Sequence, residues 1–161
     1  MKKIIIALSI IYAHIAYASH AFDLPKSCVH YRGVIPTYWG EGLSFDGDSP
    51  DKPTFGGSCS DDTISLGLGF GKGCTGGNAC RIGGYLRQRL PSSSLVIYPR
   101  EIFMPVYFGG DEDLIGYFIP ATCGANCSDS HLMWIEEGYF YEISMKAADK
   151  DELVKARESM K

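Results

Sequence analysis

Cysteines are the residues of this sequence with the clearest capacity for chemistry. Cys74 and Cys80 enclose "TGGNA", and Cys123 and Cys127 enclose "GAN". Close cysteine pairs can bind a metal, exchange disulfides or crosslink a loop. The cellular compartment decides between these uses, because thiols stay reduced in the cytosol and oxidise after export.

The N-terminus predicts export. Lys2 and Lys3 form a basic region, residues 4–11 are almost entirely apolar, and small residues follow at spacings that suit a signal peptidase. This pattern is typical of a secretory signal peptide, and the apolar stretch is shorter than the ~20 residues of a membrane span. We assign residues 1–21 to the signal peptide and residues 22–161 to a single domain. The protein is therefore expected to be periplasmic or secreted, with no membrane insertion after signal cleavage.

An even number of cysteines in an exported chain predicts a disulfide framework. Six cysteines allow 15 connectivities in principle, but each close pair encloses Gly or Asn, which tolerate the backbone of a tight closure. The two remaining cysteines are then left to pair with each other. The predicted disulfides are Cys28–Cys59, Cys74–Cys80 and Cys123–Cys127.

Zinc binding by the cysteine pairs and His131 is the alternative. The spacing of "CGANC" suits zinc, whereas that of "CTGGNAC" does not. Because thiols in an oxidising compartment pair with each other first, we expect no metal and no cofactor.

No stretch of the sequence is typical of a catalytic site. Asp129, Ser130 and His131 are adjacent, and neighbours on an extended chain point to opposite faces, so adjacency does not make a triad. The acidic stretch 46–51 lacks the glycine and glutamate that complete a calcium loop. The glycine-rich stretch 67–73 matches no nucleotide-binding pattern. We expect the protein not to be an enzyme.

The charge balance argues against nucleic acid and anionic membrane surfaces as partners. Removal of the signal peptide leaves 13 basic and 19 acidic residues and a formal net charge of −6. Phosphate recognition calls for a basic stripe, which this sequence lacks. A protein partner or a small ligand remains the expected partner.

Alternation of apolar and small residues predicts strands. Ile64, Leu66, Leu68 and Phe70 share one face of the stretch 62–70. Further strands are expected over 81–90, with glycines that mark a bulge, over 94–108, and over 113–120. The segment before them is rich in Gly, Pro and Asp and is expected to be irregular, with one short strand around Gly33–Thr37.

The C-terminal part predicts a hairpin followed by a helix. The stretch 131–146 reads as two strands that turn at Glu136–Gly138, with Trp134 in the core rather than on a ligand-stacking surface. In the stretch 149–161, Asp149 and Glu152 have the spacing of a capping box. The predicted fold class is α+β: a curved antiparallel sheet with one C-terminal helix packed on it and disulfide-stapled loops at one end.

Residues 62–160 combine four short patterns: "CTGGNACRIGG", "GYFIPATCGANC", "WIEEGYFY" and a helix that ends at Ser159. In this combination the chain resembles an uncharacterised family of exported bacterial proteins with no known activity. The resemblance supports the two local disulfides and an antiparallel sheet with a C-terminal helix. It does not cover residues 22–61, so the predicted Cys28–Cys59 pair rests on the cysteine count alone.

The segment "CGANCSDSHLMW" is also similar in shape to periplasmic lysozyme inhibitors, some of which present a short disulfide-closed loop to the enzyme cleft. We therefore expect a non-catalytic exported domain that binds a ligand or partner. The alternative is an inhibitor of a secreted hydrolase that acts through the Cys123–Cys127 loop. The candidate interaction loop is Gly124, Ala125 and Asn126.

Overall fold

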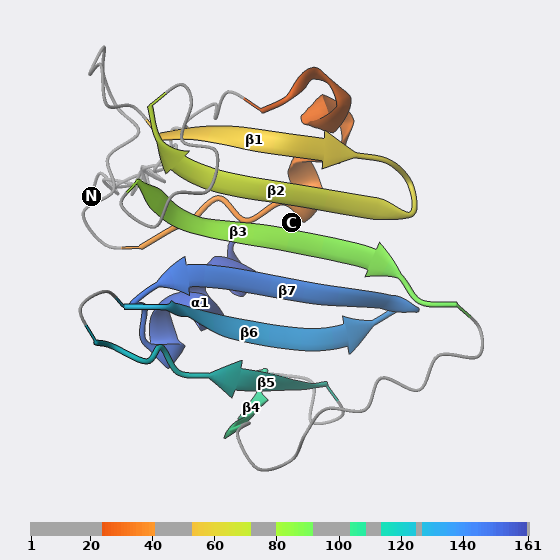
Figure 1. Ribbon diagram of the computed structural model, residues 1–161. Coiled ribbons are helices and arrows are strands. Elements are labelled where there is room, and N and C mark those ends of the chain that lie inside the picture. Colours follow the sequence, from red (N-terminus) through yellow and green to blue (C-terminus); the bar gives the residue numbers. More distant parts are fainter. Residues whose placement is uncertain are drawn as a thin grey trace, which may run out of the picture.

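The computed structural model describes residues 24–40, 53–71, 80–91, 104–108, 114–124 and 127–160. Seven strands form one antiparallel sheet in the order β1-β2-β3-β7-β6-β5-β4 (Figure 1). The strands are β1 (Pro53–Cys59), β2 (Thr63–Phe70), β3 (Arg81–Arg89), β4 (Met104–Tyr107), β5 (Ile115–Ile119), β6 (Asp129–Glu136) and β7 (Tyr139–Lys146). The predicted α+β class, an antiparallel sheet with a C-terminal helix packed on it, is confirmed.

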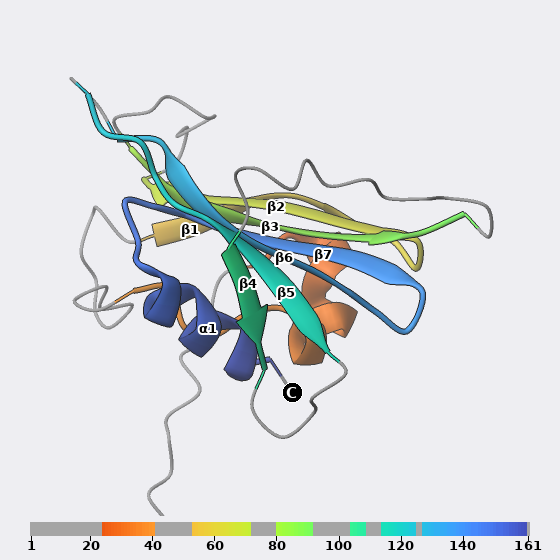
Figure 2. The same cartoon turned by 90° about the horizontal axis from the view of Figure 1, so that it is seen from below.

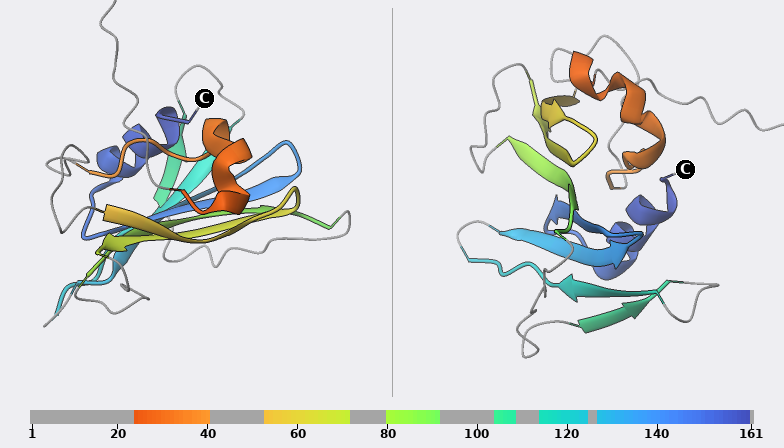
Figure 3. Two further views of the ribbon diagram at one scale, coloured as in Figure 1. Left: turned by 90° about the horizontal axis from the view of Figure 1, so that it is seen from above. Right: turned by 90° about the vertical axis from the view of Figure 1, so that its right-hand side faces the viewer.

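Two helices lie on the same face of this sheet (Figures 2 and 3). They are the 3-10 helix η1 (Lys26–Val34) and the C-terminal α-helix α1 (Lys150–Glu158). The inner face of the sheet, which the helices cover, carries most of the core, including Ile64, Leu132 and Ile143, each fully buried. No described helix has the length and apolar character needed to cross a membrane.

Helix α1 begins where the sequence predicts. The Asp149 side chain accepts a hydrogen bond from the Glu152 backbone N–H, and the Glu152 side chain accepts one from the Asp149 N–H. This reciprocal capping satisfies two backbone donors that a helix N-terminus leaves free. Leu153 and Ala156 are fully buried and hold the helix against β6 and β7.

The strand predicted around Gly33–Thr37 is wrong. Residues 26–34 form η1, whose first turn closes with a hydrogen bond from the Cys28 N–H to the Pro25 carbonyl. Cys28 is fully buried and bonded to Cys59 at the end of β1. This crosslink holds the segment across the face of the sheet, where it cannot join the strand ladder.

The bulge expected in the third strand lies at Ile82. Gly83 pairs with Leu68 and Arg81 pairs with Gly69, so Ile82 is the extra residue in β3. A Cβ atom at Gly83 would collide with the Ser144 carbonyl of β7, so only glycine allows the two strands to approach this closely. Beyond the bulge, β2 ends at Phe70, at the margin of the sheet.

Phe70 is 43 % exposed rather than on the buried face with Ile64, Leu66 and Leu68. It pairs with Pro53, the first residue of the edge strand β1. The alternation therefore correctly predicts the burial of Ile64, Leu66 and Leu68. Phe70 is exposed because it lies at the end of β2, at the margin of the sheet.

The stapled loops do not lie at one end of the sheet, contrary to the prediction. Cys59 ends β1 at the margin where β6 turns into β7, whereas the Cys123–Cys127 disulfide joins β5 to β6 at the opposite margin. Cys80, also disulfide-bonded, precedes β3 at that second margin. Sequence spacing shows which cysteines are close, but the alternating strand directions decide which margin each pair reaches.

Candidate ligand-binding pocket

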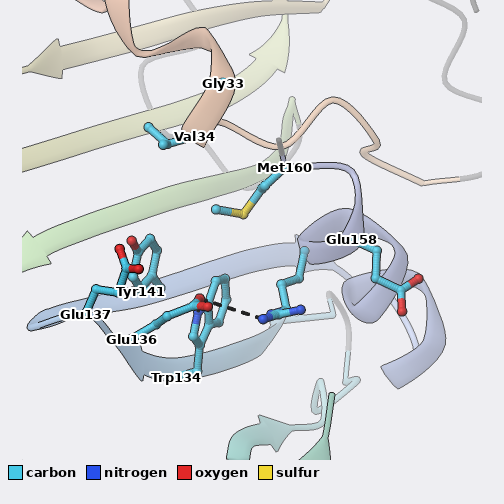
Figure 4. Close-up of a pocket in the computed structure, with 9 residues that line it drawn as sticks. Gly33, Val34, Trp134, Glu136, Glu137, Tyr141, Glu158 and Met160 are labelled. Carbon is cyan, nitrogen blue, oxygen red and sulfur yellow. Dashed lines mark hydrogen bonds and ion pairs between the residues drawn. The ribbon is translucent and has the colours of Figure 1, made fainter. Parts of the chain in front are cut away.

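A pocket of about 440 Å³ lies at the margin of the sheet where β6 turns into β7. The C-terminal ends of η1 and α1 and the β6–β7 hairpin form its walls (Figure 4). Its lining residues are Gly33, Val34, Trp134, Glu136, Glu137, Tyr141, Arg157, Glu158 and Met160. The volume falls within the range of small-ligand sites in proteins.

Two aromatic rings form the floor of the pocket. Trp134 and Tyr141 pair directly across β6 and β7, and their rings stack with centroids 4.9 Å apart and planes 5° apart. Trp134 is 1 % exposed, which confirms its predicted place in the core. The stack gives the pocket a rigid base, because both rings are fixed by the strand ladder below them.

A charged pair lies beside this stack. The guanidinium of Arg157 lies 3.7 Å from Glu136 Oε2, the same oxygen that accepts a hydrogen bond from Trp134 Nε1 at 3.1 Å. The guanidinium also lies 4.0 Å from the centre of the Phe108 ring, a cation–π contact. The Arg157 side chain is four-fifths buried, so Glu136 supplies the charge that balances it.

The hairpin turn positions Glu137 at the pocket. Glu137 and Gly138 have φ angles of 50° and 79°, the conformation of a two-residue type I′ turn. Glycine and asparagine favour this backbone, whereas a glutamate in the left-handed region costs about 1–2 kcal/mol. The turn thus places a carboxylate at the pocket in a conformation that glutamate adopts only at a cost.

Ser159 fixes the N-terminal wall of the pocket. Its hydroxyl accepts hydrogen bonds from the backbone N–H groups of Thr37 at 2.9 Å and Tyr38 at 3.0 Å. It donates one to the Ala156 carbonyl at 2.6 Å. The Cys28–Cys59 disulfide anchors the other end of the same segment. Gly33 and Val34 are therefore held between two attachment points.

A second, partly buried arginine lies beside the aromatic floor, where Arg87 of β3 pairs directly with Tyr141 of β7. The Arg87 guanidinium lies 3.6 Å from the centre of the Tyr139 ring and 6.0 Å from that of Tyr141. Burial, and then the neighbouring Tyr141, raise the pKa of Tyr85, while Arg87 acts in the opposite direction. Tyr85 therefore stays a neutral phenol throughout the physiological pH range.

The predicted interaction loop lies away from this pocket. Cys123 and Cys127 form a disulfide and a short β-bridge, and a Cβ atom at Gly124 would meet no atom within 4 Å apart from its chain neighbours. Ala125 and Asn126 lie outside the described residues, as do the predicted signal peptide and Cys74. The described flanks of the loop project beyond the sheet (Figure 2).

His131 is hydrogen-bonded to a carboxylate on the outer face of the sheet. Its Nδ1 lies 2.7 Å from Glu142 Oε1, and Ser144 stands directly opposite it on β7. A catalytic triad would need the serine hydroxyl at the other imidazole nitrogen. The Ser144 hydroxyl instead accepts a hydrogen bond from Arg81 at 3.2 Å, and no hydrogen bond joins Ser144 to His131 within the described structure.

The adjacent residues Asp129 and Ser130 also have separate structural partners. Asp129 pairs with Arg81 at 2.7 Å, and the fully buried Ser130 hydroxyl donates to the Ala148 carbonyl. Among the described residues, no group of three or more His, Cys, Asp or Glu side chains is placed to hold a metal ion.

The sequence predicted Trp134 as a core residue but predicted neither its place at the pocket nor the charged residues there. Glu136 and Glu137 were visible as two carboxylates in a predicted turn just after a core tryptophan, a signal that could have identified one wall. Arg157 and Val34 gave no signal, because their proximity depends on how η1 and α1 cross the sheet.

No protein-family model, curated protein sequence or solved structure matches this chain.

Proposed function

We propose that this protein is a non-catalytic exported binding domain and that the pocket beside the β6–β7 hairpin is its binding site. The observation that carries the proposal is a concave site whose three walls are all held in place, two of them joined to each other by Ser159 at the end of α1. The disulfide and Ser159 hold one wall, the strand ladder holds the second, and helix packing holds the third. Preorganisation of this kind lowers the entropic cost of binding.

The charges of the pocket favour recognition over chemistry. Glu136 is engaged by both Trp134 and Arg157. A carboxylate held in this way orients its neighbours rather than accepting a proton from a substrate. The polar groups thus suit a role in fixing a ligand's orientation on an aromatic base.

A thermal-shift screen of small metabolites and peptides tests this proposal. A ligand at 100 times its Kd stabilises the folded protein by about 2.7 kcal/mol. Met160 lies over the pocket (Figure 4), so Met160→Trp should abolish the shift. Met104 is 47 % exposed on β4, outside the pocket lining, so Met104→Trp should preserve the shift. Equal shifts in both variants would refute the pocket as the binding site.

The alternative is an inhibitor of a secreted hydrolase that acts through the Cys123–Cys127 loop. Its support is the closed turn, which Thr122 and Ser128 reinforce with two hydrogen bonds at 2.9 Å each. A Cys123→Ser, Cys127→Ser double variant should lose inhibition of a lysozyme panel while it keeps its fold. Absence of inhibition by the wild-type protein would remove this alternative.

A further inference from the structure

The structure describes two complete disulfides, and they differ in how far they are open to solvent. In the Cys123–Cys127 disulfide, Cys123 is exposed and Cys127 is partly buried. In the Cys28–Cys59 disulfide, Cys28 is fully buried and Cys59 is partly buried. A thiolate breaks a disulfide by reaching one sulfur and expelling the other as a thiolate. Exposure therefore decides which of the two disulfides can exchange in the folded protein.

The leaving thiolate strengthens this difference. Attack at Cys59 would expel a thiolate at Cys28, which has no exposed surface, and burial of an unpaired charge is unfavourable. Attack at Cys123 expels the thiolate of Cys127, which keeps contact with water. A hydrated thiolate is a better leaving group than one in apolar surroundings. Of the two disulfides, Cys123–Cys127 is thus the reactive one.

The turn that carries this disulfide is also held by hydrogen bonds. The Thr122 N–H donates to the Ser128 hydroxyl, and the Ser128 N–H donates to the Thr122 carbonyl, both at 2.9 Å. The Ala121 N–H donates to the Ser130 hydroxyl at 3.1 Å, and that hydroxyl donates to the Ala148 carbonyl. The disulfide joins cysteines only four positions apart, so it removes little entropy from the unfolded chain. The base of the turn should therefore stay paired when the crosslink opens.

We propose that Cys123–Cys127 is a reversible thiol-exchange site for a protein dithiol, with Cys123 as the sulfur that is attacked. A thiolate of the dithiol bonds to the Cys123 sulfur, and the S–S bond breaks to leave Cys127 as a thiolate, which takes up a proton. The second thiol of the dithiol loses its proton and attacks the reactant's own sulfur in this mixed disulfide. Cys123 then leaves as a thiolate and takes up a proton. Two electrons and two protons pass to the protein, and the dithiol becomes a disulfide.

This exchange is independent of ligand binding in the pocket and makes the turn responsive to redox state. Reduction removes the crosslink between β5 and β6 and leaves the strand ladder in place, because the disulfide lies outside both strands. The hydrogen-bonded base keeps the two thiols close, so the reverse exchange with a partner disulfide closes the turn again. A partner that recognises the closed turn binds only the oxidised protein.

Limited reduction of the folded protein with dithiothreitol, a small dithiol, tests the proposal. Alkylation with iodoacetamide followed by peptide mapping measures how fast each disulfide opens. Cys123 and Cys127 should be alkylated at least about tenfold faster than Cys28 and Cys59, and the circular dichroism spectrum should not change. Equal rates for the two disulfides, or loss of the fold when only the turn is reduced, would overturn the proposal.

A trapping experiment identifies the reactant and the attacked sulfur. Thioredoxin whose second active-site cysteine is replaced by serine stops at the mixed disulfide, because it has no second thiol. Alkylation of the freed thiol with iodoacetamide then prevents the turn from closing again. The linked peptide should contain thioredoxin joined to Cys123. Linkage mainly to Cys127 would overturn the assigned point of attack. No linkage, although dithiothreitol opens the turn, would overturn a protein dithiol as the reactant.

A substitution at the base of the turn tests how the two thiols are kept close. Ser128→Ala removes the hydroxyl that accepts the Thr122 N–H and keeps the backbone hydrogen bond. In a glutathione redox buffer, the ratio of reduced to oxidised turn should rise by about two- to tenfold. Ser58→Ala is the control, because Ser58 is exposed on β1. An equal ratio in the two variants would overturn the role of the hydrogen-bonded base.

Discussion

Replacement of Ser159 by alanine tests how the N-terminal segment is held against the helix. The substitution removes a hydroxyl that accepts hydrogen bonds from the backbone N–H groups of Thr37 and Tyr38 and donates one to the Ala156 carbonyl. Ser159 follows the last residue of α1 and keeps its own backbone hydrogen bonds to Lys155 and Ala156. The change therefore removes the hydroxyl contacts, while the hydrogen bond from the Thr37 hydroxyl to the Ser159 carbonyl at 3.2 Å and the helix end remain.

The two backbone N–H groups that lose their acceptor determine how much unfolding free energy is lost. That of Thr37 is exposed and can bond to water, so its loss costs about 0.5–1 kcal/mol. That of Tyr38 is partly buried and costs about 1–2 kcal/mol. The expected loss in unfolding free energy is therefore about 1.5–3 kcal/mol, which in a domain of this size lowers Tm by roughly 5–10 °C.

Urea unfolding and thermal unfolding measure this loss. Ser58→Ala is the matched control, because Ser58 is exposed on β1 and its side chain makes no hydrogen bond with the described residues. The urea midpoint of Ser159→Ala should fall with an unchanged m-value. Amide exchange should accelerate at Thr37 and Tyr38 before it does in the sheet. A loss below about 0.5 kcal/mol would refute the view that this hydroxyl holds the segment.

Three other substitutions test the remaining supports, each by urea unfolding. Gly83→Ala should lower the unfolding free energy by at least about 1–3 kcal/mol, because its Cβ would collide with the neighbouring strand. Gly67→Ala is the control, since its Cβ meets nothing within 4 Å, and it should lower the unfolding free energy by less than about 0.5 kcal/mol. Equal losses in the two variants would refute the close approach of β3 and β7 at Gly83. Trp134→Ala should cost about 3–5 kcal/mol because it empties a fully buried site, and a value near zero would place the ring outside the core. The Cys28→Ser, Cys59→Ser double variant should cost about 3.5–4 kcal/mol, since the crosslink closes a loop of 31 residues; a loss below about 1 kcal/mol would show that other contacts hold η1.

Local sequence signals predicted the elements whose causes are local. The hairpin turns at Glu137–Gly138 and the helix begins at Asp149, because turn and capping preferences act over two to four residues. The period-two pattern of 62–70 likewise predicts a strand with one buried face.

Sequence patterns gave wrong predictions where a contact between residues far apart in the sequence decides the local conformation. The strand predicted around Gly33–Thr37 is wrong, because η1 extends to Val34 and lies on a face of the sheet. The sequence predicted the Cys28–Cys59 disulfide but not that this crosslink would hold the segment there. The pocket was missed for the same reason. Arg157 reads as an ordinary charge in the last turn of a helix, and only the crossing of α1 over β6 brings it to Glu136 and the Phe108 ring.

The two candidate functions occupy opposite margins of the sheet and can therefore be tested independently. β6 connects them: it leaves the Cys123–Cys127 turn at Asp129 and reaches the pocket at Trp134 and Glu136. A strand in the middle of a seven-stranded ladder transmits little distortion, because its neighbours hold it along its length. Serine substitutions in the turn should thus leave ligand binding in the pocket unchanged, and Met160→Trp should leave any activity of the turn unchanged. Loss of both activities in either variant would mean that the two margins form one functional unit rather than two.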